Sequence, residues 1–171
     1  MRPIALLIAL VIFTSTATAG DVEQCNIEKY SAYSKAKETF QKNMTDLAIN
    51  AVPEAKSTAV IYLKNQIMLI NRQKLAVELL LTHNPAKVEV SERLRRWLIP
   101  HPQDDETLSK LSPEYAALVE AIAKSRQIKD LPNADKLREA MRTKVAPSPQ
   151  FRKLYEALNK KVRNLNRIHC K

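Results

Sequence analysis

The side chains best suited to metal binding or proton transfer are three histidines, His83, His101 and His169. Their spacing matches no helical His-Glu-x-x-His motif, and the chain has no Cys-x-x-Cys pair of the kind that binds zinc. His101 lies beside Asp104, Asp105 and Glu106, a grouping that could bind a metal ion or act as acid and base. Mutual charge neutralisation on a solvated loop explains the same grouping, so we expect no metal site and no cofactor.

Two basic clusters are stronger candidates for a functional surface. The segment ERLRRWL contains the first cluster, Arg93, Arg95, Arg96 and Trp97. Arginine and tryptophan are the residue types enriched where proteins bind one another. The second cluster lies near the C-terminus and consists of Lys160, Lys161, Arg163 and Arg167. Each cluster also has a structural explanation, because Trp97 can be buried with its apolar neighbours and the helix dipole favours cations at a helix C-terminus.

Net charge narrows the class of partner. The chain has 28 Lys and Arg against 18 Asp and Glu. One of these cations, Arg2, lies in a predicted leader, so the mature chain has 27 cations against 18 acids, a net charge of +9. This charge favours an acidic protein, a sulfated glycan or an anionic lipid surface. Nucleic acid is the least favoured anion outside the cytoplasm.

The first nineteen residues have the pattern of a secretory signal peptide. Arg2 gives a positive start, residues 4–13 form an apolar run, and Ala17-Thr18-Ala19 is a small-residue cleavage site. The apolar run is short for a hydrocarbon core of about 30 Å, so we expect cleavage after Ala19 rather than a membrane anchor. Residues 20–171 would then form one soluble domain, secreted from the cell or exported to a bacterial periplasm.

The only two cysteines, Cys25 and Cys170, lie at opposite ends of this predicted mature chain. In an oxidising compartment two cysteines of one chain most simply pair. A free thiol or a bond to another chain is the alternative. The paired form would close a loop of 145 residues (170 − 25) and would hold the first and last helices together.

The scarcity of glycine excludes several classes of protein. The one glycine, Gly20, lies at the predicted cleavage site. Because glycine supplies positive φ and close backbone approach, its absence from the body disfavours P-loops, dinucleotide-binding loops, nucleophile elbows and EF-hands. Hairpins that turn on Asn-Gly or Asp-Gly are also absent, which disfavours a β-rich fold.

Apolar residues recur at three- and four-residue spacing, which is typical of amphipathic helices. The pattern predicts helices over residues 23–50, 54–82, 88–98, 113–128, 132–145 and 149–168, with a loop over 99–107. Ser112-Pro113 and Ser148-Pro149 are typical helix starts, with a serine cap followed by a first-turn proline. Lys74 interrupts the apolar seam of the second helix. Three explanations are open: its side chain extends to solvent, pairs with an acid or marks a polar pocket.

These features predict an all-α, single-domain bundle of five or six helices. The leading functional hypothesis is a secreted, non-catalytic binding protein, an inhibitor or neutraliser of an acidic protein or another polyanion. One alternative is a carrier of a small apolar ligand enclosed between helices. Another is a small helical enzyme with a basic pocket for an anionic substrate. Asn43-Met44-Thr45 is a glycosylation sequon that would matter only in a eukaryotic protein.

Overall fold

The computed structural model describes residues 19–98, 102–126 and 130–171. Within them the chain forms six α-helices and no strand, which confirms the predicted all-α bundle. The helices are α1 (Ala19–Ala51), α2 (Lys56–His83), α3 (Pro102–Leu111), α4 (Pro113–Arg126), α5 (Ala134–Ala140) and α6 (Pro149–Asn166). The predicted leader lies outside the described residues apart from Ala19, where α1 begins. No helix in the described ranges is long and apolar enough to cross a bilayer.

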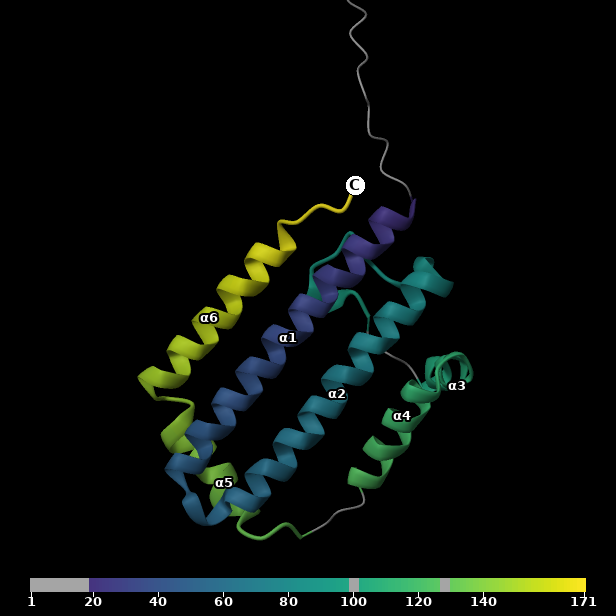
Figure 1. Cartoon of the computed structure of the whole chain (residues 1–171). Coiled ribbons are helices and arrows are strands. Elements are labelled where there is room, and N and C mark those ends of the chain that lie inside the picture. The colour runs from purple at the N-terminus through teal and green to yellow at the C-terminus, as the bar shows by residue number, and fades with distance from the viewer. Residues whose placement is uncertain (1–18, 99–101, 127–129) are drawn as a thin grey trace, which may run out of the picture.

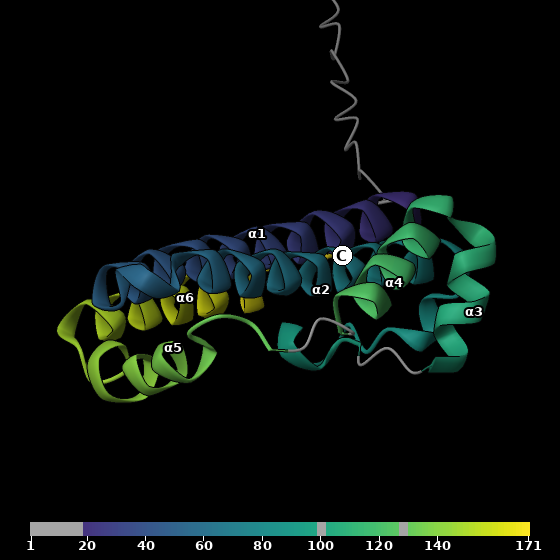
Figure 2. The same ribbon diagram turned by 90° about the horizontal axis from the view of Figure 1, so that it is seen from below.

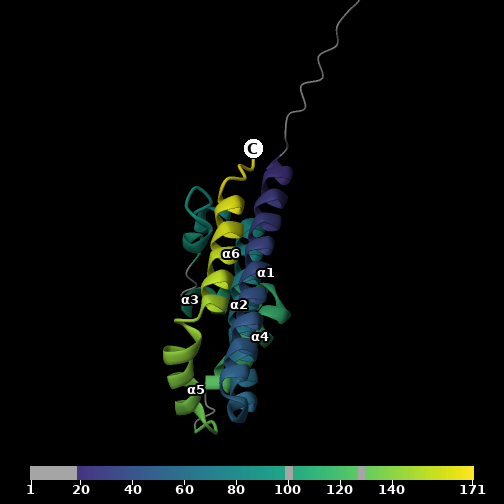
Figure 3. The same cartoon turned by 90° about the vertical axis from the view of Figure 1, so that its left-hand side faces the viewer.

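The helices form one main layer with a thinner second layer on one side. α6, α1, α2 and α4 lie side by side in that order (Figure 1). Seen from below, α5 and the segment after α2 cover one side of this layer (Figure 2). The side view shows the segment after α2 beside α6, on the side away from α1, with α5 below it (Figure 3). Within the described residues, no helix covers the other side of the α1–α6 pair (Figures 1 and 2).

Serine caps start two of the helices, as the sequence predicts. The Ser148 hydroxyl accepts a hydrogen bond of 3.1 Å from the Phe151 amide at the start of α6. The Ser112 hydroxyl accepts one of 3.2 Å from the Tyr115 amide in α4. The turn before α5 needs a left-handed backbone, and Asn133 provides it with φ 57°. Asparagine tolerates this conformation better than most residues, so the turn forms without glycine.

The larger of two apolar clusters is built around Trp97, which is 1% exposed. Its ring stacks on Tyr30 with centroids 5.6 Å apart, and its indole N–H donates to the Glu92 carbonyl at 2.9 Å. The smaller cluster consists mainly of alanine and joins the α1–α2 turn to α5. Small residues there allow the helix backbones to approach closely.

The two ends of the chain are joined, as predicted. Cys25 in α1 and Cys170 form a disulfide. One turn along α1, the Lys29 ammonium donates to the Ile168 carbonyl at 2.9 Å. The C-terminus therefore lies near the start of α1 (Figure 1), which keeps the last residues from fraying.

Two of the predicted elements, a helix and a loop, are wrong. Residues 88–98 are not an α-helix but turns, with one short 3-10 helix at Leu94–Arg96. A straight helix would separate Val88 and Leu94 by about 120° around its axis, whereas the observed turn buries both. The predicted loop over 99–107 overlaps α3, which begins at Pro102. Acidic residues follow in its first turn, where the helix dipole stabilises them.

Other details of the sequence interpretation depend on particular side chains. Lys74 pairs with Glu78 one turn later, with 3.5 Å between nitrogen and oxygen, so an acid partner explains its place in the seam. His83 ends α2, as predicted. His101 and Ile128 lie outside the described residues.

Candidate functional site

The segment that carries the first basic cluster packs directly against the helix that carries the second. Two asparagines of α6 hold it there. The Leu94 amide donates to the Asn166 side-chain oxygen at 3.0 Å, and the Arg95 guanidinium donates to the Asn159 side-chain oxygen at 2.8 Å. Arginines of the two clusters therefore share one face, although the clusters are about 70 residues apart in sequence.

A hollow of about 360 Å³ lies where these segments meet. Four arginines line it, together with two asparagines and a valine. They are Arg93 and Arg95 from the segment after α2, and Arg163 and Arg167 from the end of α6. We call this surface the arginine hollow. No carboxylate is among its lining residues, and none of the four guanidiniums makes an ion pair with a described residue.

Burial of neighbouring residues turns these arginines outward. Leu94 and Trp97 insert into the core with 0% and 1% exposure, which leaves Arg93 and Arg95 on the surface. On α6, Val162 and Leu165 face the core. The intervening Arg163 then points away, because successive helix residues differ by about 100°.

The helix dipole reduces the cost of gathering these charges. Arg163 lies in the last turn of α6 and Arg167 follows it. A helix C-terminus carries a partial negative charge, which stabilises cations by about 0.3–1 kcal/mol each. The arginine hollow can thus hold its positive charge without an internal carboxylate.

Other members of the predicted clusters lie elsewhere. Arg96 is exposed and lies 3.6 Å from Glu92. Lys160 is exposed and does not line the hollow. Lys161 lines a different hollow, between α1 and α6. Trp97 is buried with Leu94 and Leu98, which matches the structural explanation of that tryptophan.

The positive charge of Arg95 also acts on a half-buried lysine of α1. Lys37 of α1 donates to the Gln73 side-chain oxygen at 3.2 Å and lies 5.4 Å from the centre of the Tyr33 ring. Burial lowers the pKa of Lys37, and the charge of Arg95 lowers it further. An anion bound by Arg95 would offset the second effect.

The four guanidinium groups of the hollow are suited to binding an anion. Guanidinium groups donate paired hydrogen bonds that match carboxylate, phosphate and sulfate oxygens. In the described ranges, no three His, Cys, Asp or Glu side chains gather as a metal site.

The clearest cluster of an arginine with an acid lies away from the hollow and is structural. Arg72 of α2 binds Asp105 of α3 through both carboxylate oxygens, at 2.5 and 2.6 Å. The Tyr115 hydroxyl of α4 donates to the same carboxylate at 2.6 Å. Burial, followed by this hydrogen bond, raises the pKa of Tyr115 to about 12. These contacts join three helices.

The sequon asparagine lies within α1, eight residues before its last residue. Asn43 is exposed, but Thr45 of the same sequon is 6% exposed and donates its hydroxyl to the Gln41 carbonyl at 2.8 Å. Glycosylation of Asn43 stays a prediction.

Comparison of the chain with protein-family models, with curated proteins and with solved structures finds no match in any of the three. The functional argument therefore depends on the surface itself. Sequence reasoning did not find Asn159 and Asn166, the residues that hold the two clusters together. They are seven residues apart, hence on one face of α6, and this spacing is the one signal that could have indicated a shared role.

Proposed function

We propose that this protein is a secreted, non-catalytic inhibitor or neutraliser that binds an acidic protein through the arginine hollow. One observation carries the proposal. Four arginines from two distant segments line a single hollow that contains no carboxylate. Such a surface is complementary to a partner that inserts acidic side chains.

The shape of the surface favours a protein over an extended polyanion. The four charges surround a hollow of about 360 Å³ rather than a long strip. Asn159, Asn166 and Val162 complete its lining, so neutral polar and apolar groups accompany the charges. Protein–protein interfaces combine polar and apolar groups in this way and are enriched in arginine. A sulfated glycan and an anionic lipid surface are the alternatives that the experiment separates.

The experiment compares two variants of equal charge. Arg93→Ala/Arg163→Ala removes two arginines of the hollow. Arg152→Ala/Lys153→Ala removes two exposed cations from the start of α6. Arg152 lies three turns before Arg163 on nearly the same side of the helix, about 16 Å away. The oxidised mature protein and both variants are immobilised and exposed to the secreted or periplasmic fluid that the protein meets naturally.

We expect the unmodified protein to retain one acidic protein at physiological salt. Each arginine of the hollow should contribute about 1–2 kcal/mol, a factor of roughly 5 to 30 in affinity, while the control variant should bind normally. If only glycans or lipids are retained, and only at low salt, the basic charge binds anions non-specifically. Equal losses in both variants would contradict a role for the hollow.

A further inference from the structure

A second hollow, of about 450 Å³, lies between α1 and α6. Its floor is apolar and consists of Ala32, Ala36 and Phe40 from α1 and Leu154, Ala157 and Leu158 from α6. We call it the α1–α6 groove. It is separate from the arginine hollow, because Lys161 in the groove and Arg163 in the hollow lie about 160° apart around α6. It does not face the second layer of the fold.

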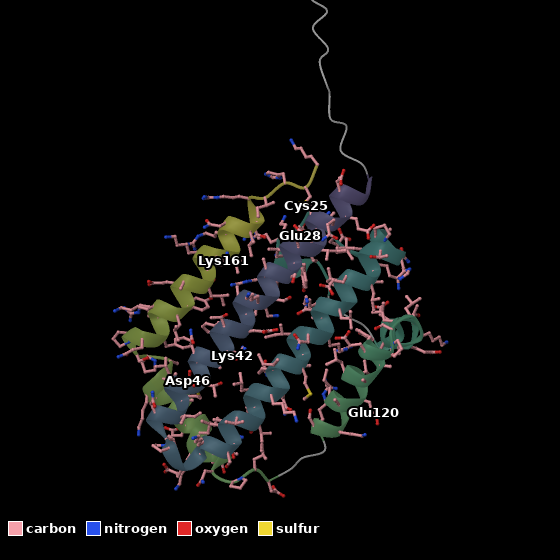
Figure 4. The ribbon with its side chains drawn as sticks, in the orientation of Figure 1. Cys25, Glu28, Lys42, Asp46, Glu120 and Lys161 are labelled. Atoms are coloured by element: carbon pink, nitrogen blue, oxygen red, sulfur yellow. A yellow bond between two sulfur atoms is a disulfide. The ribbon has the colours of Figure 1, made fainter. Side chains whose placement is uncertain are left out.

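The antiparallel register of the two helices places both of its cations at one end. Cys25 is bonded to Cys170, and Phe40 contacts Phe151 and Tyr155 with ring centroids 6.0 and 6.5 Å away. Between these two points, Lys35 must lie across from Lys161. In Figure 4, Lys161 lies on α6 toward the disulfide end, while Lys42 and Asp46 mark the opposite end of α1.

The charges of this end have no acidic partner among the described residues. Lys35 and Lys161 are exposed, and neither makes an ion pair with a described residue. No carboxylate is among the residues that line the groove. From the two lysines the groove continues along α1 to Asn43, eight residues or about 12 Å away. Phe40 and Leu154 line that far end together with Thr39 and Asn43, so its side chains are apolar or neutral.

We propose that the α1–α6 groove binds a small anionic amphiphile of the fatty-acid class. Its carboxylate lies between Lys35 and Lys161, and its chain follows the alanine floor toward Phe40 and Leu154. The volume lies in the range of small-molecule sites. Charge at only one end of an apolar floor matches a molecule with one anionic head and one apolar tail. The proposal uses a different surface from the proposed function and does not depend on it.

Calorimetric titration of the intact oxidised protein tests this assignment. The probes are octanoate, decanoate and dodecanoate, each below the concentration at which it aggregates, with decanol as the uncharged analogue. Burial of a methylene in this open groove should tighten binding about twofold to fourfold, until the chain exceeds the groove. Decanol should bind more weakly than decanoate.

Three variants separate the groove from general effects of charge. Lys35→Gln/Lys161→Gln should weaken decanoate binding about twofold to thirtyfold and leave decanol binding unchanged. Lys42→Gln/Lys153→Gln removes the same charge from exposed positions outside the lining and should change neither. Ala157→Phe places a large side chain in the groove at an exposed position and should abolish binding of both probes. Its helical content, measured by circular dichroism, checks that the variant folds.

Several outcomes would overturn the proposal. They are affinity independent of chain length, equal losses in the two lysine variants, unchanged binding by Ala157→Phe, and binding seen only with aggregated amphiphile. The Arg93→Ala/Arg163→Ala variant should bind decanoate normally. A loss there instead would place the anion in the arginine hollow, while the proposed protein partner would still be tested by its own capture experiment.

Discussion

Replacement of the disulfide by Cys25→Ser/Cys170→Ser should destabilise the protein more than any single contact at its ends. The bond joins two residues that are 145 positions apart in sequence. Closing a loop of that length in the unfolded chain lowers its entropy by an amount worth about 5 kcal/mol. Disulfides often stabilise proteins by less than this calculated value. We therefore expect the free energy of unfolding to fall by about 3–5 kcal/mol. The total free energy of unfolding of a domain of this size is roughly 5–15 kcal/mol.

Urea denaturation at neutral pH measures the loss with two probes. Far-UV circular dichroism follows the helices, and fluorescence follows Trp97, the only tryptophan, which is buried against Tyr30. The dependence of the unfolding free energy on urea should steepen, because an unfolded chain without the crosslink exposes more surface. The unmodified protein in reductant should behave as the variant does.

Lys29→Met is the control for local contacts. It keeps the disulfide but removes the 2.9 Å hydrogen bond to the Ile168 carbonyl. We expect the free energy of unfolding to fall by about 1.5–3 kcal/mol, the usual range for a charged hydrogen bond. A loss below about 1 kcal/mol in the disulfide variant, with the same urea dependence, would refute the loop-closure reasoning. The two ends would then be held by packing alone.

The contacts among Arg72, Asp105 and Tyr115 give two further predictions. Asp105→Asn should destabilise the protein by about 2–4 kcal/mol in urea denaturation, because Arg72 loses its charged partner; Tyr115→Phe should cost only about 1 kcal/mol. A larger loss in Tyr115→Phe would contradict this order. The raised pKa of Tyr115, about 12, favours the folded state while the phenol is neutral. Stability should be complete below about pH 10 and decline toward pH 12. Thermal melts of Tyr115→Phe should show a smaller decline.

Local signals predicted most of the helices correctly. Ser148 and Ser112 marked two starts because serine capping depends on the next three residues alone. The error at residues 88–98 has the opposite origin. There the burial of Val88, Leu94 and Trp97 in a core made by other helices outweighs the local preference for a helix. Contacts with distant residues do not appear in the periodicity of a short segment.

The candidate site was predicted in its parts but not in its arrangement. Arg93 and Arg95 were noted for their type, as were Arg163 and Arg167. Their common hollow depends on hydrogen bonds from Asn159 and Asn166, and no spacing in the chain predicts which partners those amides select. The groove that holds Lys35 and Lys161 was missed for the same reason.

Residue types and short-range periodicity were sufficient for the helical class, the pairing of the only two cysteines and the excess of positive charge. Each depends on composition or on neighbours within a few turns. The meeting of the two arginine pairs, and of Lys35 with Lys161, required the packed structure. The register of α1 against α6 and the position of the segment on α6 are fixed by side chains buried between elements far apart in sequence.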